Sequence, residues 1–100
     1  MYLRPMISKI AKFKVKQNKA DECLEAIREF VNAVKHHESD TLYYESFQEP
    51  DGVSFTHIMS FKDEEAEKYH RNTAHVNKFV NILYPNCEEK PVFTDVIQIE

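Results

Sequence analysis

The sequence contains a single glycine, Gly52, among its 100 residues. Phosphate-binding loops of the Rossmann and P-loop types need several glycines, so nucleotide cofactors held by such loops are excluded. Two cysteines, Cys23 and Cys87, are too few for a disulfide framework, and we expect a cytoplasmic protein. No apolar run approaches the roughly 18 residues of a membrane span. Met1–Met6 lacks the apolar block of a secretory signal.

Composition indicates a small globular domain. Apolar residues make up 42% of the chain and aromatic residues 12%, which suits a packed core. The net charge is −4 and no basic stripe is present, so nucleic acid is not an expected partner. The length predicts one domain over residues 1–100. A lone chain of this size buries only about 60% of its unfolded surface, so its stability is modest.

The periodicity of apolar residues predicts four strands and two helical regions. The predicted strands are Met6–Lys16, Thr41–Glu49, Val53–Phe61 and Val92–Ile99, with a turn at 50–52. A first helix starts at Asn18 as N-cap and ends with His36 and His37. The second helical region has two parts, Asp63–Arg71 and a segment capped by Thr73.

This order predicts an α+β, ferredoxin-like βαββαβ fold with a four-stranded antiparallel sheet. Two helical regions cover only one face of such a sheet. If Phe13, Phe55 and Ile97 mark the covered face, several apolar residues remain on the other. These are Ile10, Ile58, Val92 or Val96, and one of Tyr43 and Tyr44. We therefore expect a homodimer joined through the sheet face.

Two histidines, His70 and His75, lie at the break within the second helical region, directly after an apolar strand. Imidazole titrates near neutral pH, so either ring could act as a general base. Alternatively, both are packing or surface residues at helix ends. Their spacing of five does not suit two metal ligands on one helical face, so no metal site is expected.

Four further residues are candidates for substrate binding. His57 lies on the apolar face of the third predicted strand, where a hydrogen-bonded core histidine is the alternative interpretation. Tyr44 and Tyr69 could donate hydrogen bonds to a ligand oxygen, or could serve in aromatic packing. Asn72 at the helix break could reach a pocket or cap a helix.

Three motifs together resemble the antibiotic biosynthesis monooxygenase-like family of small dimeric α/β-barrel proteins. They are Lys19–Ala26, Leu42–Glu45, and the run from Phe61 through His70 and Thr73 to His75. The likeness covers nearly the whole chain. It implies a dimeric α/β barrel and a cofactor-independent monooxygenase that acts on a small aromatic or quinol-like molecule.

The chain also departs from the family pattern. The family often has Trp at the position of Phe61 and Glu at that of Met59, and this chain contains no tryptophan. A haem-degrading branch uses a histidine where this chain has Phe79, which argues against haem. No cofactor is expected.

Two rival functions remain open. Another class of relatives has a similar His-Thr-His run and isomerises a phosphorylated sugar, and the same two histidines could transfer the proton. A dimer that binds a small molecule without catalysis is the third possibility, because the fold hosts such proteins too.

Overall fold

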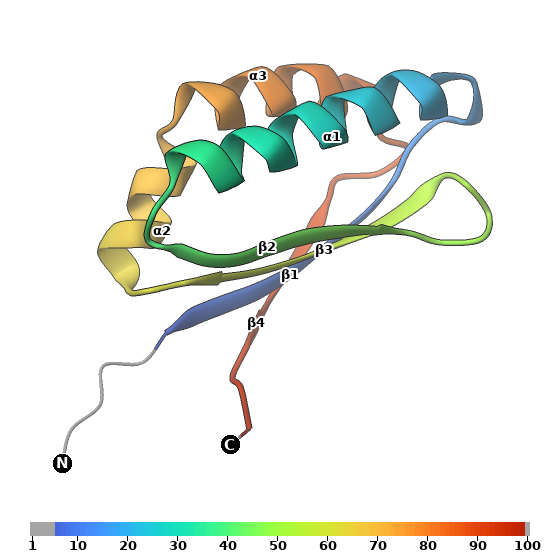
Figure 1. The fold of residues 1–100 in the computed structure, drawn as a ribbon. Coiled ribbons are helices and arrows are strands. Elements are labelled where there is room, and N and C mark those ends of the chain that lie inside the picture. The colour runs from blue at the N-terminus through green and yellow to red at the C-terminus, as the bar shows by residue number, and fades with distance from the viewer. Residues whose placement is uncertain (1–5, 100) are drawn as a thin grey trace, which may run out of the picture.

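The computed structural model describes residues 6–99 and contains a four-stranded sheet with helices packed on one face (Figure 1). The strands are β1 Ile7–Lys14, β2 Thr41–Gln48, β3 Ser54–Phe61 and β4 Val92–Val96. The α-helices are α1 Ala20–His37, α2 Glu64–Arg71 and α3 Ala74–Leu83. Two 3₁₀ turns are η1 Gln17–Lys19 and η2 Tyr84–Asn86. The sequence indicated no secretory signal in Met1–Met6, and of this segment only Met6 is among the described residues.

The sheet has the spatial order β2-β3-β1-β4, and each neighbouring pair is antiparallel. This arrangement is the predicted α+β, ferredoxin-like fold. The turn between β2 and β3 contains Gly52 at φ 79°, a backbone conformation that glycine adopts without steric cost. A short hairpin turn joins β2 to β3. Helix α1 lies in the connection from β1 to β2, and α2 and α3 lie in the connection from β3 to β4 (Figure 1).

Strand β3 lies in the interior of the sheet, and its strict alternation fixes which face is buried. The inward residues of β3 are at most 3% exposed: Phe55, His57, Met59 and Phe61. Val53, directly before the strand, continues the pattern and is 8% exposed. Ser54, Thr56, Ile58 and Ser60 are half-buried on the opposite face. The predicted face assignment for this strand is confirmed, and it places an imidazole among apolar side chains.

Helix α1 covers the inward face with residues at helical spacing. Cys23, Ile27, Phe30 and Val34 are all at most 4% exposed, and burying each large side chain contributes about 1.5–3 kcal/mol. The predicted N-cap at Asn18 is wrong. The chain makes a 3₁₀ turn there, and α1 begins after Lys19, which forms no side-chain cap. Among residues 6–99, no helix is both long enough and apolar enough to cross a membrane.

The break between α2 and α3 is built by two capping side chains. Asp63 accepts a hydrogen bond from the Ala66 amide at 2.9 Å, which starts α2. Thr73 has extended backbone and accepts from the Val76 amide at 3.3 Å, which confirms its predicted role as the cap of α3. The break brings His70 and His75 close to the end of α1, because both contact Glu38.

The last predicted strand is too long. β4 ends at Val96, where its ladder with β1 stops at the Ser8–Val96 pair. Ile97 and Ile99 lie beyond that ladder and are 91% and 94% exposed, so the alternating apolar pattern continues without a neighbouring strand. Ile97 therefore does not mark the covered face. Phe93 does, since it pairs with Ala11.

The opposite face of the sheet remains partly apolar, as expected. Ile10 and Ile58 pair with each other at its centre, and Tyr43 pairs with Ser60. Val92 and Val96 lie on the same face, opposite Lys12 and Ser8. Of the two tyrosines, Tyr44 points inward and is 6% exposed. The described helices leave this face uncovered (Figure 1).

Candidate active site

An apolar cavity of about 390 Å³ lies between the inward face of the sheet and the helices. Its walls come mainly from the aromatic and aliphatic side chains Ala11, Phe13, Phe30, Met59, Phe61 and Phe79. Polar side chains interrupt these walls, among them Tyr44, His57 and His70. Charged side chains also contribute to the lining: Lys9, Glu67 and Arg71. Glu67 forms ion pairs with both Lys9 and Arg71. A mostly apolar hollow with a few convergent polar groups is typical of small-molecule sites.

His57 and Tyr44 form a buried pair from neighbouring strands. The Tyr44 hydroxyl and Nδ1 of His57 are 2.9 Å apart. The other ring nitrogen, Nε2, is buried and has no hydrogen-bond partner among the described residues. An unpaired buried polar atom costs about 1–3 kcal/mol, and a ligand atom in the cavity would remove that cost. The sequence placed His57 correctly on the covered face, and of the two tyrosines that it left open the structure turns Tyr44 inward.

Burial sets the protonation of this pair. It disfavours the imidazolium form and lowers the pKa of His57 to about 4. Burial also raises the pKa of Tyr44 well above its usual value, and the negative charge of Glu38 adds to the effect. At neutral pH both side chains are therefore uncharged, and His57 is a hydrogen-bonding group and a weak base.

The protonation of His57 predicts a pH dependence of stability. The unfolded chain binds a proton on this ring below about pH 6.5, whereas the folded protein does so only near pH 4. The stability that a neutral His57 contributes is thus complete above pH 6.5 and is lost as the pH falls toward 4. Between pH 7 and 5, wild type should lose about 2 kcal/mol more than His57→Asn in urea unfolding. Asn retains an amide near Nδ1, so equal losses in the two proteins would contradict the assignment.

His70 belongs to the same cavity and to a second polar cluster. Its ring lies 5.6 Å from that of Tyr44 and 5.0 Å from that of Phe61, measured between centroids. Its Nδ1 is 2.9 and 3.0 Å from the two carboxylate oxygens of Glu38. Nε2 is therefore the ring nitrogen left for a ligand in the cavity.

His75 reaches the same carboxylate from α3 but does not line the cavity. Its Nε2 is 2.5 Å from Oε2 of Glu38. The ring instead borders a hollow of about 30 Å³ between α1 and α3, too small for an organic ligand. The structure thus brings both predicted histidines together on one carboxylate and places only His70 at the cavity.

The remaining predicted site residues lie elsewhere. Tyr69 is 60% exposed and does not line the cavity. Asn72 is exposed, and its side-chain amide donates to the Lys68 carbonyl at 2.8 Å, which caps the end of α2. Both belong to the outer side of the α2–α3 break.

Two features of the described residues concern metal and haem binding. Residues 6–99 contain no group of three His, Cys, Asp or Glu side chains that could hold a metal ion. Phe79, at the position of the haem-branch histidine, stacks on Phe30 with ring centroids 4.3 Å apart. Its side chain has no atom that could coordinate iron.

Sequence reasoning missed Glu38, which joins the two histidines. This residue directly follows α1 and looks like any acidic residue in a polar segment, yet its side chain is only 1% exposed. Thr41 Oγ1 donates to its Oε1 at 2.6 Å. Burial opposes ionisation of this carboxyl, but hydrogen bonds from His70, Thr41 and His75 outweigh that effect and lower its pKa.

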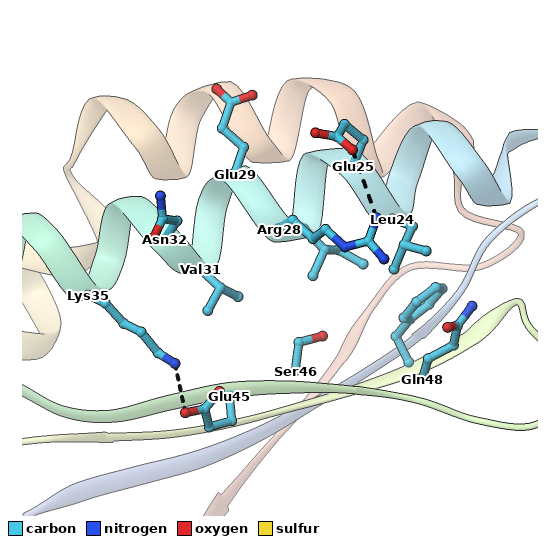
Figure 2. A pocket seen from close by; sticks show the side chains of 12 residues that line it. Leu24, Glu25, Arg28, Glu29, Val31, Asn32, Lys35, Glu45, Ser46 and Gln48 are labelled. Carbon is cyan, nitrogen blue, oxygen red and sulfur yellow. Dashed lines mark hydrogen bonds and ion pairs between the residues drawn. The ribbon is translucent and has the colours of Figure 1, made fainter.

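A larger hollow lies elsewhere, between α1 and the edge strand β2 (Figure 2). This groove of about 640 Å³ is open to solvent, and ion pairs cross or border it. Lys35 pairs with Glu45 at 2.8 Å, and Arg28 pairs with Glu25 at 3.9 Å. None of the described residues that line this groove has a buried side-chain polar atom without a partner. We therefore assign the site to the smaller inner cavity, where the chemistry-bearing side chains meet.

Comparison with known proteins agrees with this fold. A family model described as antibiotic biosynthesis monooxygenase matches residues 6–82. A crystal structure named antibiotic biosynthesis monooxygenase superimposes with a TM-score of 0.86 at 21% identity, covering 94% of this chain and 99% of that one. A protein from Caulobacter crescentus CB15, described as a candidate member of the same class, gives a TM-score of 0.89 at 22% identity. That match covers 99% of this chain and 94% of that one.

A conserved protein from Methanosarcina mazei Go1 gives a TM-score of 0.85 at 19% identity over 95% of this chain and 94% of that one. No curated protein matches the chain. At such low identities the structural matches show the fold alone.

Proposed function

Because the chain belongs to the antibiotic biosynthesis monooxygenase family, we propose that it oxygenates a small phenol- or quinol-like molecule in the inner cavity. A single observation carries the proposal: an apolar cavity of about 390 Å³ whose polar lining includes the imidazoles of His57 and His70 and the phenol of Tyr44. The aromatic walls suit a planar ring. The polar groups suit the oxygen atoms on such a ring.

His70 is the proposed base. Proton uptake on its ring creates a positive charge next to the Glu38 carboxylate, which favours that charge. His57 is a poor base, because burial holds its pKa at about 4. We assign His57 and Tyr44 to binding: the unpartnered Nε2 of His57 meets a substrate oxygen, and Tyr44 holds the ring in place.

The reaction needs only the substrate, O₂ and a base. Removal of a proton from the phenol or quinol by His70 makes the ring electron-rich, and one electron passes to O₂. The substrate radical and superoxide then combine through a new C–O bond, and the resulting peroxide anion takes back the proton from His70 and becomes a hydroperoxide. The carbon that carries the hydroperoxide also carries one hydrogen, so loss of water leaves a carbonyl there. In the overall reaction a CH₂ group and O₂ become C=O and H₂O. The dry, apolar walls protect these intermediates.

Oxygen consumption tests this function. An oxygen electrode with a panel of quinols and phenols that carry a reactive CH or CH₂ position should record uptake. Mass spectrometry with ¹⁸O₂ should then find one labelled oxygen atom in the product. Deuterium incorporation from solvent into a ketose phosphate, without oxygen uptake, would instead support the isomerase. Tight ligand binding without turnover of any compound would support a binding protein.

We also propose that the uncovered face of the sheet binds a second copy of the chain. It presents six apolar side chains: Ile10, Tyr43, Phe47, Ile58, Val92 and Val96. Phe47 and Val92 are 50% and 63% exposed, which is costly for aromatic and aliphatic groups clustered on one face. A two-fold pairing of these faces would remove them from water.

Ile58→Glu at the centre of this face should weaken the dimer at least about 100-fold, because it would bury two carboxylates near the two-fold axis. Sedimentation equilibrium measures the change. Asn32→Glu adds the same charge on the exposed side of α1 and should leave the dimer intact. A wild-type protein that is monomeric at micromolar concentration, or equal effects of both variants, would contradict this interface.

The two cysteines support the cytoplasm as the proposed compartment. Cys23 is completely buried on the inward side of α1, Cys87 is half-buried, and both are free thiols. Free thiols persist where the surroundings are reducing.

A further inference from the structure

Glu38 occupies an unfavourable position for a negative charge. It is the C-cap of α1, where the helix dipole repels anions, and its side chain is almost completely buried. An isolated buried carboxylate at a helix C-terminus would be protonated or excluded from the interior. Three donors compensate for these costs: the Thr41 hydroxyl, Nδ1 of His70 and Nε2 of His75.

These contacts determine which nitrogen of each ring carries hydrogen. An ionised carboxylate only accepts hydrogen bonds, so every nitrogen that faces Glu38 must be an N–H. His70 is thus held with hydrogen on Nδ1, and a neutral ring then has its lone pair on Nε2. For His75 the relation is reversed, because Nε2 faces the carboxylate. Free imidazole in water has no comparable restraint.

We infer that Glu38 is a positioning residue that holds His70 in the Nδ1–H tautomer, so that Nε2 can accept the proton of a substrate in the cavity. The inference rests on the proposed function of His70 as a base. On proton transfer the substrate O–H bond breaks and an Nε2–H bond forms. The Nδ1–H proton stays on the ring, and the resulting imidazolium is stabilised by the adjacent carboxylate. Glu38 itself never contacts the substrate.

The same geometry gives His75 and Thr41 a supporting role. They do not line the cavity, and their hydrogen bonds end on the carboxylate. Each fixes one carboxylate oxygen: Thr41 bonds Oε1 and His75 bonds Oε2. The carboxylate therefore cannot rotate away from His70 without breaking one of them. The two histidines at the helix break therefore have different roles: His70 lines the cavity, and His75 holds the carboxylate of Glu38.

The tautomer of His70 can be measured without any substrate. Long-range ¹H–¹⁵N spectra of the wild-type protein, at a pH where the ring is neutral, distinguish a protonated from an unprotonated ring nitrogen. We expect Nδ1 protonated and Nε2 unprotonated in His70, and the opposite in His75. Protonation of Nε2 in neutral His70 would overturn the inference, whatever the activity of the protein.

Glu38→Gln tests the link to turnover. The amide has one acceptor oxygen where the carboxylate has two, and it carries no charge to stabilise the imidazolium that forms when His70 takes the substrate proton. With a quinol that wild type oxidises, kcat should fall at least about tenfold while KM stays within about twofold. The matched control is Glu45→Gln, which removes another paired carboxylate away from the cavity and should leave kcat unchanged.

His75 offers a conservative rescue. Gln at this position places an amide N–H near the former Nε2, so His75→Gln should retain most of the activity, whereas His75→Leu should resemble Glu38→Gln. Equal losses in both His75 variants would contradict the supporting role. If wild type turns over quinols but Glu38→Gln keeps full kcat, the inference fails and the proposed function stands. If the tautomers are as expected but no quinol reacts, the proposed function fails instead.

Discussion

Replacing His70 with asparagine is expected to lower kcat for quinol oxidation by about 10²- to 10⁴-fold, the range that a positioned general base supplies. Asparagine places its amide N–H near the position of Nδ1, so the hydrogen bond to Glu38 can persist. It has no counterpart of Nε2. The substitution therefore removes the proton acceptor in the cavity and preserves the polar cluster behind it.

The control for this experiment is His36→Asn. His36 is an exposed histidine near the end of α1, and its Nδ1 is 2.8 Å from the Asn32 carbonyl oxygen. Oxygen uptake should be unchanged in this variant. Full activity in His70→Asn, with normal folding by circular dichroism, would show that the base is another group.

Phe30→Ala is expected to lower the free energy of unfolding by about 3–5 kcal/mol, because it removes a buried aromatic ring and leaves a cavity. Phe30 is 4% exposed and lies where α1, α3 and the sheet meet. Its ring stacks on Phe79 at 4.3 Å and meets Tyr44 edge-on at 5.3 Å, measured between centroids. It also lines the proposed substrate cavity.

Urea unfolding measures this loss, with Tyr69→Ala as the matched control. Tyr69 is 60% exposed, so truncating its ring should change the free energy of unfolding by only about 0.5 kcal/mol. A cost for Phe30→Ala no larger than that of Tyr69→Ala would contradict the assignment of Phe30 to the core. If Phe30→Ala lowers the free energy of unfolding by about 3–5 kcal/mol, a modestly stable domain of this size is partly unfolded at room temperature.

The fold could be predicted because local patterns and tertiary structure agree along most of the chain. The alternation in β3 and the apolar stripe of α1 each specify one buried face, and both faces meet in the same core. The hairpin turn with Gly52 and the Thr73 cap are short-range features that neighbouring residues determine. Such features do not depend on contacts far away in the sequence.

The predictions that failed depend on tertiary neighbours. Val92–Ile99 alternates throughout, but a strand exists only where another strand pairs with it, and the β1 ladder ends opposite Val96. Asn18 is a good N-cap by residue type. The connection from β1 instead passes through a 3₁₀ turn, which moves the start of α1 to Ala20.

The candidate site could be predicted only in part. His57 lies on a strand whose period of two specifies its direction, and it reaches the cavity. For Tyr43 and Tyr44 the sequence indicated only that one of them lies on the bare face, and the register shift near Thr41 shows why alternation alone could not decide which. Tyr69 and Asn72 lie on a short helix whose orientation over the sheet cannot be read from its own residues. Glu38 becomes a buried ligand of two histidines only because α2 and α3 close over the end of α1.

The most direct test of the central claim is a crystal structure of the protein with a quinol bound under anaerobic conditions, where the substrate cannot react. We expect the aromatic ring among Phe13, Phe61 and Phe79, with an oxygen atom within hydrogen-bond distance of Nε2 of His57 or His70. A quinol bound instead in the groove between α1 and β2, with the inner cavity unoccupied, would contradict the account.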